Sequence, residues 1–117
     1  MELYIHIPYC RQKCRYCDFA SYPGQESTMA AYVDALLREA DAMVSTAQRR
    51  PIQTVFIGGG TPSILPAHLL RKLLSGLRER FDIPSGIEFT SEANPGTLTP
   101  EWLEAALEGG VNRLSMG

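Results

Sequence analysis

The sequence predicts an α/β fold in which about four parallel strands alternate with three helices. Four short runs with the composition of strands lie at residues 3–7, 53–57, 87–92 and 111–116. Segments with apolar residues at helical spacing separate each run from the next. Because strands and helices alternate, we expect a parallel sheet with right-handed crossovers.

Length and composition indicate one globular unit. The chain has 117 residues, 44% of them hydrophobic, and a formal net charge of -2, so it has no basic field that would attract nucleic acid or anionic lipid. No run of apolar residues is long enough to span a membrane. The opening residues "MELYIHIP" do not resemble a signal peptide. These features predict a soluble, cytoplasmic protein, in which thiols stay reduced.

The predicted elements follow one another with recognisable boundaries. The first strand stops at Pro8, and the second is followed by three glycines. Pro66 suits the first turn of the second helix, and Thr99 suits the N-cap of the third, which Gly109 and Gly110 terminate. The helical patterns rest on Val33, Leu36, Leu37, Ala40, Met43 and Val44, then on Leu69, Leu70, Leu73, Leu74 and Leu77, then on Leu103, Ala106 and Leu107.

Polar residues share one face of the predicted strands. Tyr4 and His6 alternate with apolar neighbours, as do Glu88, Thr90 and Glu92. In a barrel wall the apolar set packs on the helices and the polar set faces the lumen. Active sites of such barrels lie at the carboxyl ends of the strands. The three segments that follow strand ends, at Cys10, at 58–61 and at Glu92, should therefore meet at one edge of the sheet.

All three cysteines lie close together, at Cys10, Cys14 and Cys17. An odd count in a reduced compartment argues against disulfides. A zinc site needs a fourth ligand, for which His6 or His68 is available, but the usual paired spacing is missing. An iron–sulfur cluster normally takes four thiolates. With three, a four-iron cluster keeps one iron with an open coordination position, where chemistry can take place.

The motif C-x-x-x-C-x-x-C with Tyr16 before the last cysteine resembles the radical S-adenosylmethionine enzymes. The surrounding "YIHIPYC", "GGGTPS" at 58–63 and "EANP" at 92–95 are similar to the oxygen-independent coproporphyrinogen III oxidase family and its haem-chaperone relatives. The resemblance covers essentially the whole chain. It implies the N-terminal portion of a partial (βα)6 barrel of the radical S-adenosylmethionine type.

The resemblance also implies the cofactors and their ligands. Cys10, Cys14 and Cys17 would hold a 4Fe-4S cluster whose fourth iron chelates S-adenosylmethionine. The residues that would bind S-adenosylmethionine are Tyr4, Tyr16, Gly59, Gly60, Thr61 and Glu92. From the residues alone, the glycine run also suits a tight turn without a ligand, Tyr16 a loop aromatic, Glu92 a solvent-facing glutamate and His6 a packed strand residue.

One departure separates two functions within the resemblance. The oxidase has a further cysteine two residues after the last ligand, whereas this chain has Asp18 and Phe19 there and begins directly at the first strand. Both features resemble the haem-chaperone branch, which binds haem and passes it to a recipient protein. The alternative is the oxidase, which converts porphyrinogen propionates to vinyl groups by oxidative decarboxylation. Its partner would be a reductase.

Length suggests a third alternative. The resemblance implies several hundred residues, with the rest of the barrel and a C-terminal domain beyond residue 117. We therefore expect residues 1–117 to be the N-terminal part of a truncated radical S-adenosylmethionine core domain. On its own, such a chain would be inactive and would expose an open sheet edge.

Overall fold

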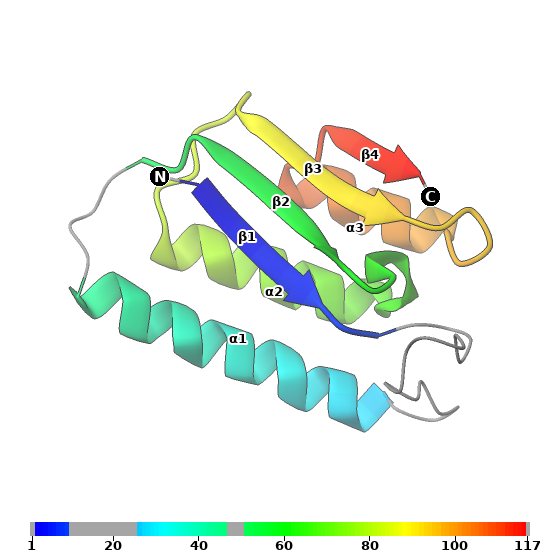
Figure 1. Cartoon of the computed structure of the whole chain (residues 1–117), viewed down its shortest axis with the longest axis horizontal. Coiled ribbons are helices and arrows are strands. Elements are labelled where there is room, and N and C mark those ends of the chain that lie inside the picture. The colour runs from blue at the N-terminus through cyan, green and yellow to red at the C-terminus, as the bar shows by residue number, and fades with distance from the viewer. Residues whose placement is uncertain (1, 10–25, 47–50, 117) are drawn as a thin grey trace.

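The computed structural model describes residues 2–9, 26–46 and 51–116. Strands and helices alternate along these residues, as the sequence predicts (Figure 1). The elements are β1 (Glu2–Ile7), α1 (Glu26–Thr46), β2 (Thr54–Gly59), the 3-10 helix η1 (Pro62–Ile64), α2 (Ala67–Arg80), β3 (Glu88–Ala93), α3 (Pro100–Gly109) and β4 (Arg113–Met116).

The four strands form one parallel sheet in the order β1-β2-β3-β4. One row across the sheet runs through Tyr4, Phe56, Thr90 and Arg113. The helices lie on one side of the sheet, with α2 packed between α1 and α3 (Figure 1). Sequential strand order with helices on one face is the arrangement of a barrel wall, not of a doubly wound sheet.

The side chains of each strand alternate between two environments. Leu3, Ile5 and Ile7 of β1 are buried against the helices, as are Val55, Ile57 and Phe89 of the neighbouring strands. We call the opposite side the open face. It carries Glu2, Tyr4, His6, Thr54, Phe56, Gly58, Glu88, Thr90, Glu92, Arg113 and Ser115. The predicted division into a helix-covered apolar face and a polar face is confirmed.

The ends of the strands differ from the sequence predictions by at most two residues, and one of these differences is informative. The second strand was predicted to stop before the glycine run, but β2 continues through Gly58 and Gly59. Both residues pair with β1, because His6 and Ile7 lie opposite them. Pro66 is the residue before α2, not a residue of its first turn.

The predicted caps of α3 are confirmed. The Thr99 hydroxyl accepts a hydrogen bond from the Trp102 amide at 3.1 Å, which satisfies one of the unpaired donors at the start of the helix. Gly110 has a φ of 106°, and its amide closes the helix on the carbonyl of Leu107. Trp102 itself is buried, and its indole donates to the Pro62 carbonyl at 3.2 Å.

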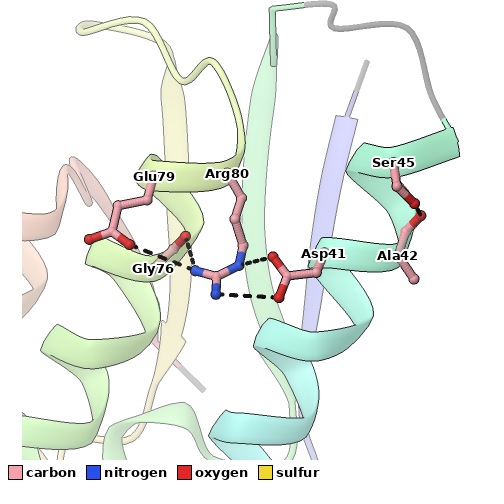
Figure 2. Close-up of polar contacts among 6 residues, drawn as sticks. All are labelled: Asp41, Ala42, Ser45, Gly76, Glu79 and Arg80. Carbon is pink, nitrogen blue, oxygen red and sulfur yellow. Dashed lines mark hydrogen bonds and ion pairs between the residues drawn. The ribbon is translucent and has the colours of Figure 1, made fainter.

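Ion pairs join α1 to α2 on the outer surface. Arg80 donates to both carboxylate oxygens of Asp41, at 2.6 and 3.5 Å, and also to the Gly76 carbonyl (Figure 2). Lys72 lies 2.6 Å from Asp34, and its hydrogen bond holds the pKa of that carboxyl below the usual value. These exposed pairs link the two helices, and each contributes little to the free energy of folding.

Candidate functional site at the carboxyl end of the sheet

The end of β1 is held by the glycine-rich segment that follows β2. The Gly60 amide donates to the Ile7 carbonyl at 2.7 Å, and the Thr61 amide donates to the Tyr9 carbonyl at 2.6 Å. Two backbone bonds therefore fix the chain where it enters the cysteine segment. Cys10, Cys14, Tyr16 and Cys17 themselves lie outside the described residues, as do Asp18 and Phe19.

Tyr32 of α1 supports the same place from the other side. Its hydroxyl donates to the His6 carbonyl at 2.5 Å, and its ring meets that of Tyr9 edge-on at 5.7 Å. Burial raises the pKa of both phenols, and for Tyr32 the neighbouring Tyr9 and Glu39 add to the effect. Tyr32 was not predicted as a site residue, because nothing local distinguishes it from the apolar positions of the helix.

Glu92 reaches from β3 to the end of β2. Its Oε1 atom accepts a hydrogen bond from the Gly59 amide at 2.9 Å. A backbone N–H directed at a carboxylate is a favourable charge-assisted bond, and it fixes the side chain over the glycines. Among the described residues, Oε2 has no hydrogen-bond partner. One oxygen of Glu92 thus positions the group, and the other is available to a ligand.

Gly58 and Gly59 of β2 must be glycines because neighbouring side chains lie too close to leave room for a Cβ atom. A Cβ on Gly58 would lie 2.4 Å from Oε1 of Glu92, and one on Gly59 would lie 2.6 Å from the His6 ring. Gly59 also has a φ of 112°, a conformation that favours glycine. The glycine run therefore makes room for two side chains that cross the end of β2 from the neighbouring strands.

Tyr4 and His6 lie together on the open face, as predicted. The Tyr4 hydroxyl lies 3.2 Å from Nδ1 of His6, and its ring stacks on Phe56 with 5.9 Å between centroids and 11° between planes. Tyr4 remains 57% exposed. Its ring offers an apolar surface on the open face near the middle of β1, which suits a ligand with both apolar and polar parts.

A buried hydroxyl connects η1 to the segment after β3. Ser63 is only 3% exposed; its Oγ accepts from the Asn94 amide at 3.0 Å and lies 2.5 Å from Oγ1 of Thr97. This contact ties the glycine-rich segment to the "EANP" segment through Ser63. The motif order in the sequence indicated both segments but not the serine that joins them.

The described residues bring together four of the sequence-predicted cofactor positions. Gly59, Gly60, Thr61 and Glu92 meet at the carboxyl end of β2 and β3, and Tyr4 lies on the same open face nearer the middle of β1. Residues 2–9, 26–46 and 51–116 contain no group of three metal-ligating side chains. The amides of Gly59, Gly60 and Thr61 are already hydrogen-bonded within the chain, so the group that suits a polar organic ligand is the second carboxylate oxygen of Glu92.

The fold is that of an α/β barrel wall, with a candidate ligand site at the carboxyl edge of its sheet. The model of the radical SAM superfamily matches residues 4–117, and the chain belongs to that superfamily. No helix within the described part of the chain is long and apolar enough to cross a membrane.

Relatives narrow the family further. The chain is 46% identical over 118 residues to "Heme chaperone HemW" of Escherichia coli K12 and 43% identical to the protein of that name from Buchnera aphidicola. The structure of coproporphyrinogen III oxidase (HemN) from Escherichia coli, described as a radical SAM enzyme, matches with a TM-score of 0.87 and 32% identity over 99% of this chain. The chain spans 31% of the two HemW proteins and 27% of the HemN chain.

Proposed function

We propose that this chain forms the part of a haem-chaperone-like protein that binds a 4Fe-4S cluster and S-adenosylmethionine. In this proposal, Cys10, Cys14 and Cys17 hold three irons and leave the fourth to the cofactor. Residues 1–117 make up the N-terminal part of a radical SAM core domain. Membership of the superfamily supports the proposal, and so does the anchoring of Tyr9 immediately before Cys10.

The observation that carries the proposal is the bond between Glu92 and the Gly59 amide. It places a carboxylate beside the backbone of Gly59, Gly60 and Thr61, at the same edge to which β1 delivers Cys10. A carboxylate with one unused oxygen suits the sulfonium, amino group or ribose hydroxyls of S-adenosylmethionine. Tyr4 and Tyr16 would supply aromatic surface for the adenine or the cluster.

A reduced cluster held by Cys10, Cys14 and Cys17 would supply the electron for cleavage of a carbon–sulfur bond of S-adenosylmethionine. The chain's own residues bind and orient that cofactor and exclude water from it. Glu92 would fix its position through charge, and the Gly60 and Thr61 amides hold Ile7 and Tyr9, the residues that lead to Cys10. The clustering of cysteines in a reduced compartment makes the cytoplasm the proposed location.

Haem transfer is the favoured activity of the whole protein, and decarboxylation of a porphyrinogen is the alternative. Asp18 and Phe19 support the first, as does the higher identity to HemW than to HemN. The structural match to HemN supports the second. Haem or a porphyrinogen, with a recipient protein or a reductase, would then be the partners. An inactive fragment is the third candidate.

Anaerobic reconstitution with iron and sulfide tests the cluster. We expect a brown protein with about four irons per chain, and an EPR signal on reduction that changes when S-adenosylmethionine is added. Cys10→Ala, Cys14→Ala and Cys17→Ala should each lose the signal. A protein that takes up zinc and no iron under these conditions would overturn the proposal.

Assays of haem binding and of vinyl product on a longer protein that contains this chain distinguish the chaperone from the oxidase. Addition of haem should give a stable shift of the Soret band, and incubation with coproporphyrinogen III, reductant and S-adenosylmethionine should give no vinyl product. Vinyl product without haem retention would establish the oxidase. If the longer protein shows neither while the cluster assembles normally, the haem-related proposals fail and the cofactor site stands.

A further inference from the structure

The segment that carries the three cysteines joins the end of β1 to the start of α1. The chain leaves β1 at Ile7 and passes through Tyr9 to Cys10, and α1 begins at Glu26. Figure 1 shows the first turns of α1 at the same end of the molecule as the carboxyl end of β1. Contacts between these two elements therefore determine how far apart the two ends of the cysteine segment can move.

Tyr32 makes two such contacts from the second turn of α1. Its hydroxyl donates a hydrogen bond to the His6 carbonyl at 2.5 Å. Its ring meets the ring of Tyr9 edge-on, with 5.7 Å between centroids and 84° between planes. Tyr9 is buried in the apolar core, and Tyr32 packs against that core. We call these two residues the tyrosine pair.

The Tyr32 hydroxyl holds the side of the chain that β2 cannot reach. The segment after β2 donates to the carbonyls of Ile7 and Tyr9. Successive residues of a strand alternate in direction, so the His6 carbonyl points away from β2. Among the described residues, Tyr32 is the side chain that donates to it. The chain that leads to the first cysteine is thus held from two sides, by backbone amides and by one phenol.

We propose that Tyr32 is a positioning residue for the cluster ligands: through Tyr9 and the end of β1 it keeps the two ends of the cysteine segment together. This inference rests on the proposed 4Fe-4S cluster. Cys10, Cys14 and Cys17 must bring three thiolates to one cluster, which costs conformational entropy. The cost is lower when the ends of the segment are already fixed. Residues behind metal ligands commonly tune metal affinity in this way.

Release of iron from the anaerobically reconstituted protein to a chelator, without denaturant, tests this role. Tyr32→Phe keeps the ring contact and loses the hydrogen bond, whereas Tyr32→Leu loses both. We expect Tyr32→Leu to release iron about tenfold faster than the wild type, and Tyr32→Phe to lie between the two. The EPR signal of the reduced cluster should broaden in the same order, because a less restrained segment holds the cluster in several arrangements.

A variant that weakens α1 elsewhere distinguishes positioning from a general loss of stability. Leu37 lies on the same helix, is buried, and packs beside Gly76 of α2, where an added Cβ would lie 2.6 Å from its side chain. Leu37→Ala leaves a cavity in the core, so its urea midpoint should fall below that of Tyr32→Phe. It should nevertheless release iron at the wild-type rate, because the tyrosine pair is intact.

Tyr9→Leu tests whether the two rings act as one contact. The single variant should release iron faster than the wild type. The double variant with Tyr32→Leu should release iron no faster than Tyr32→Leu alone, because both substitutions remove the same ring contact. A double variant whose rate is the product of the two single effects would overturn the tyrosine pair as a unit.

Two further results would overturn this inference while the proposed cluster stands. One is release of iron at the wild-type rate from both Tyr32→Phe and Tyr32→Leu. The other is release from Leu37→Ala as fast as from Tyr32→Leu, because iron retention would then follow stability alone. A wild-type protein that takes up no iron is a different outcome: it would overturn the proposed cluster, and this inference with it.

Discussion

The Gly59 amide holds one carboxylate oxygen of Glu92. The negative charge of Glu92 can therefore be removed while the hydrogen bond that positions the side chain is kept. Glu92→Gln retains an oxygen that can accept from Gly59 but removes the charge. We expect S-adenosylmethionine to bind the reconstituted protein at least tenfold more weakly, measured by calorimetry. Glu88→Gln is the control, because Glu88 lies on the same face of β3 and pairs with Arg113. Equal affinity of both variants would remove Glu92 from the proposed site.

Replacement of a glycine can cost stability through backbone strain and through a clash of the added Cβ, and Gly59 and Gly86 allow the two effects to be measured separately. Both have positive φ, but an added Cβ at Gly86 meets nothing within 4 Å, whereas one at Gly59 meets the His6 ring. Gly86→Ala should lower the free energy of unfolding by about 1–3 kcal/mol through backbone strain alone. Gly59→Ala should cost more, because the His6 ring must also move. Urea denaturation of the two variants measures the difference; equal losses would mean that His6 adapts without cost.

Tyr32 makes the contact between α1 and β1 sensitive to alkaline pH. The folded phenol has a raised pKa, so its contribution to stability is complete below pH 10 and is lost as the pH rises through the folded value. At pH 8, Tyr32→Phe should lower the free energy of unfolding by about 1 kcal/mol, because the hydrogen bond to the His6 carbonyl is removed. Between pH 8 and about pH 10.5, the free energy of unfolding should fall less in the variant than in the wild type. Urea denaturation midpoints at the two pH values measure both effects. An equal loss in both proteins would contradict this account.

The pair of Asp41 and Arg80 joins the two outer helices and lies in contact with water (Figure 2). Asp41→Asn should lower the free energy of unfolding by about 0.2–1 kcal/mol at low salt, and by less in about 0.5 M salt, because ions screen exposed charges. Asp82→Asn is the control, because Asp82 forms no ion pair with a described residue. A cost that is independent of salt would indicate a packing change instead.

The elements were largely predictable from the sequence because their signals are local. Helical spacing, the Thr99 cap and the Gly110 terminus each act within a few residues. The contacts that build the site are not local: Gly59 and Glu92 lie 33 residues apart, and Tyr32 and His6 lie 26 apart. The motifs indicated which segments meet, but the continuation of β2 through Gly58 depends on pairing with β1, which no local pattern shows.

At the scale of the whole molecule, one apolar core connects every helix and the first three strands. Trp102, the only tryptophan, is 1% exposed within it and bonds to η1. Its fluorescence and the far-ultraviolet circular dichroism should therefore change together during urea denaturation, as expected of a single cooperative unit. Transitions at different urea concentrations would show that α3 and η1 unfold separately from the sheet.

The crossing of Glu92 over Gly58 has a consequence for how such sequences can change. A Cβ at position 58 would lie 2.4 Å from Oε1 of Glu92 and 2.6 Å from the Phe56 ring, so both neighbours penalise a larger residue there. Position 58 should therefore covary with positions 56 and 92: a library randomised at all three should yield folded variants with a larger residue at 58 only where the side chains at 56 and 92 have become smaller. If Glu92 binds the cofactor as proposed, those variants should fold but bind it weakly, so the same contact would constrain both folding and binding.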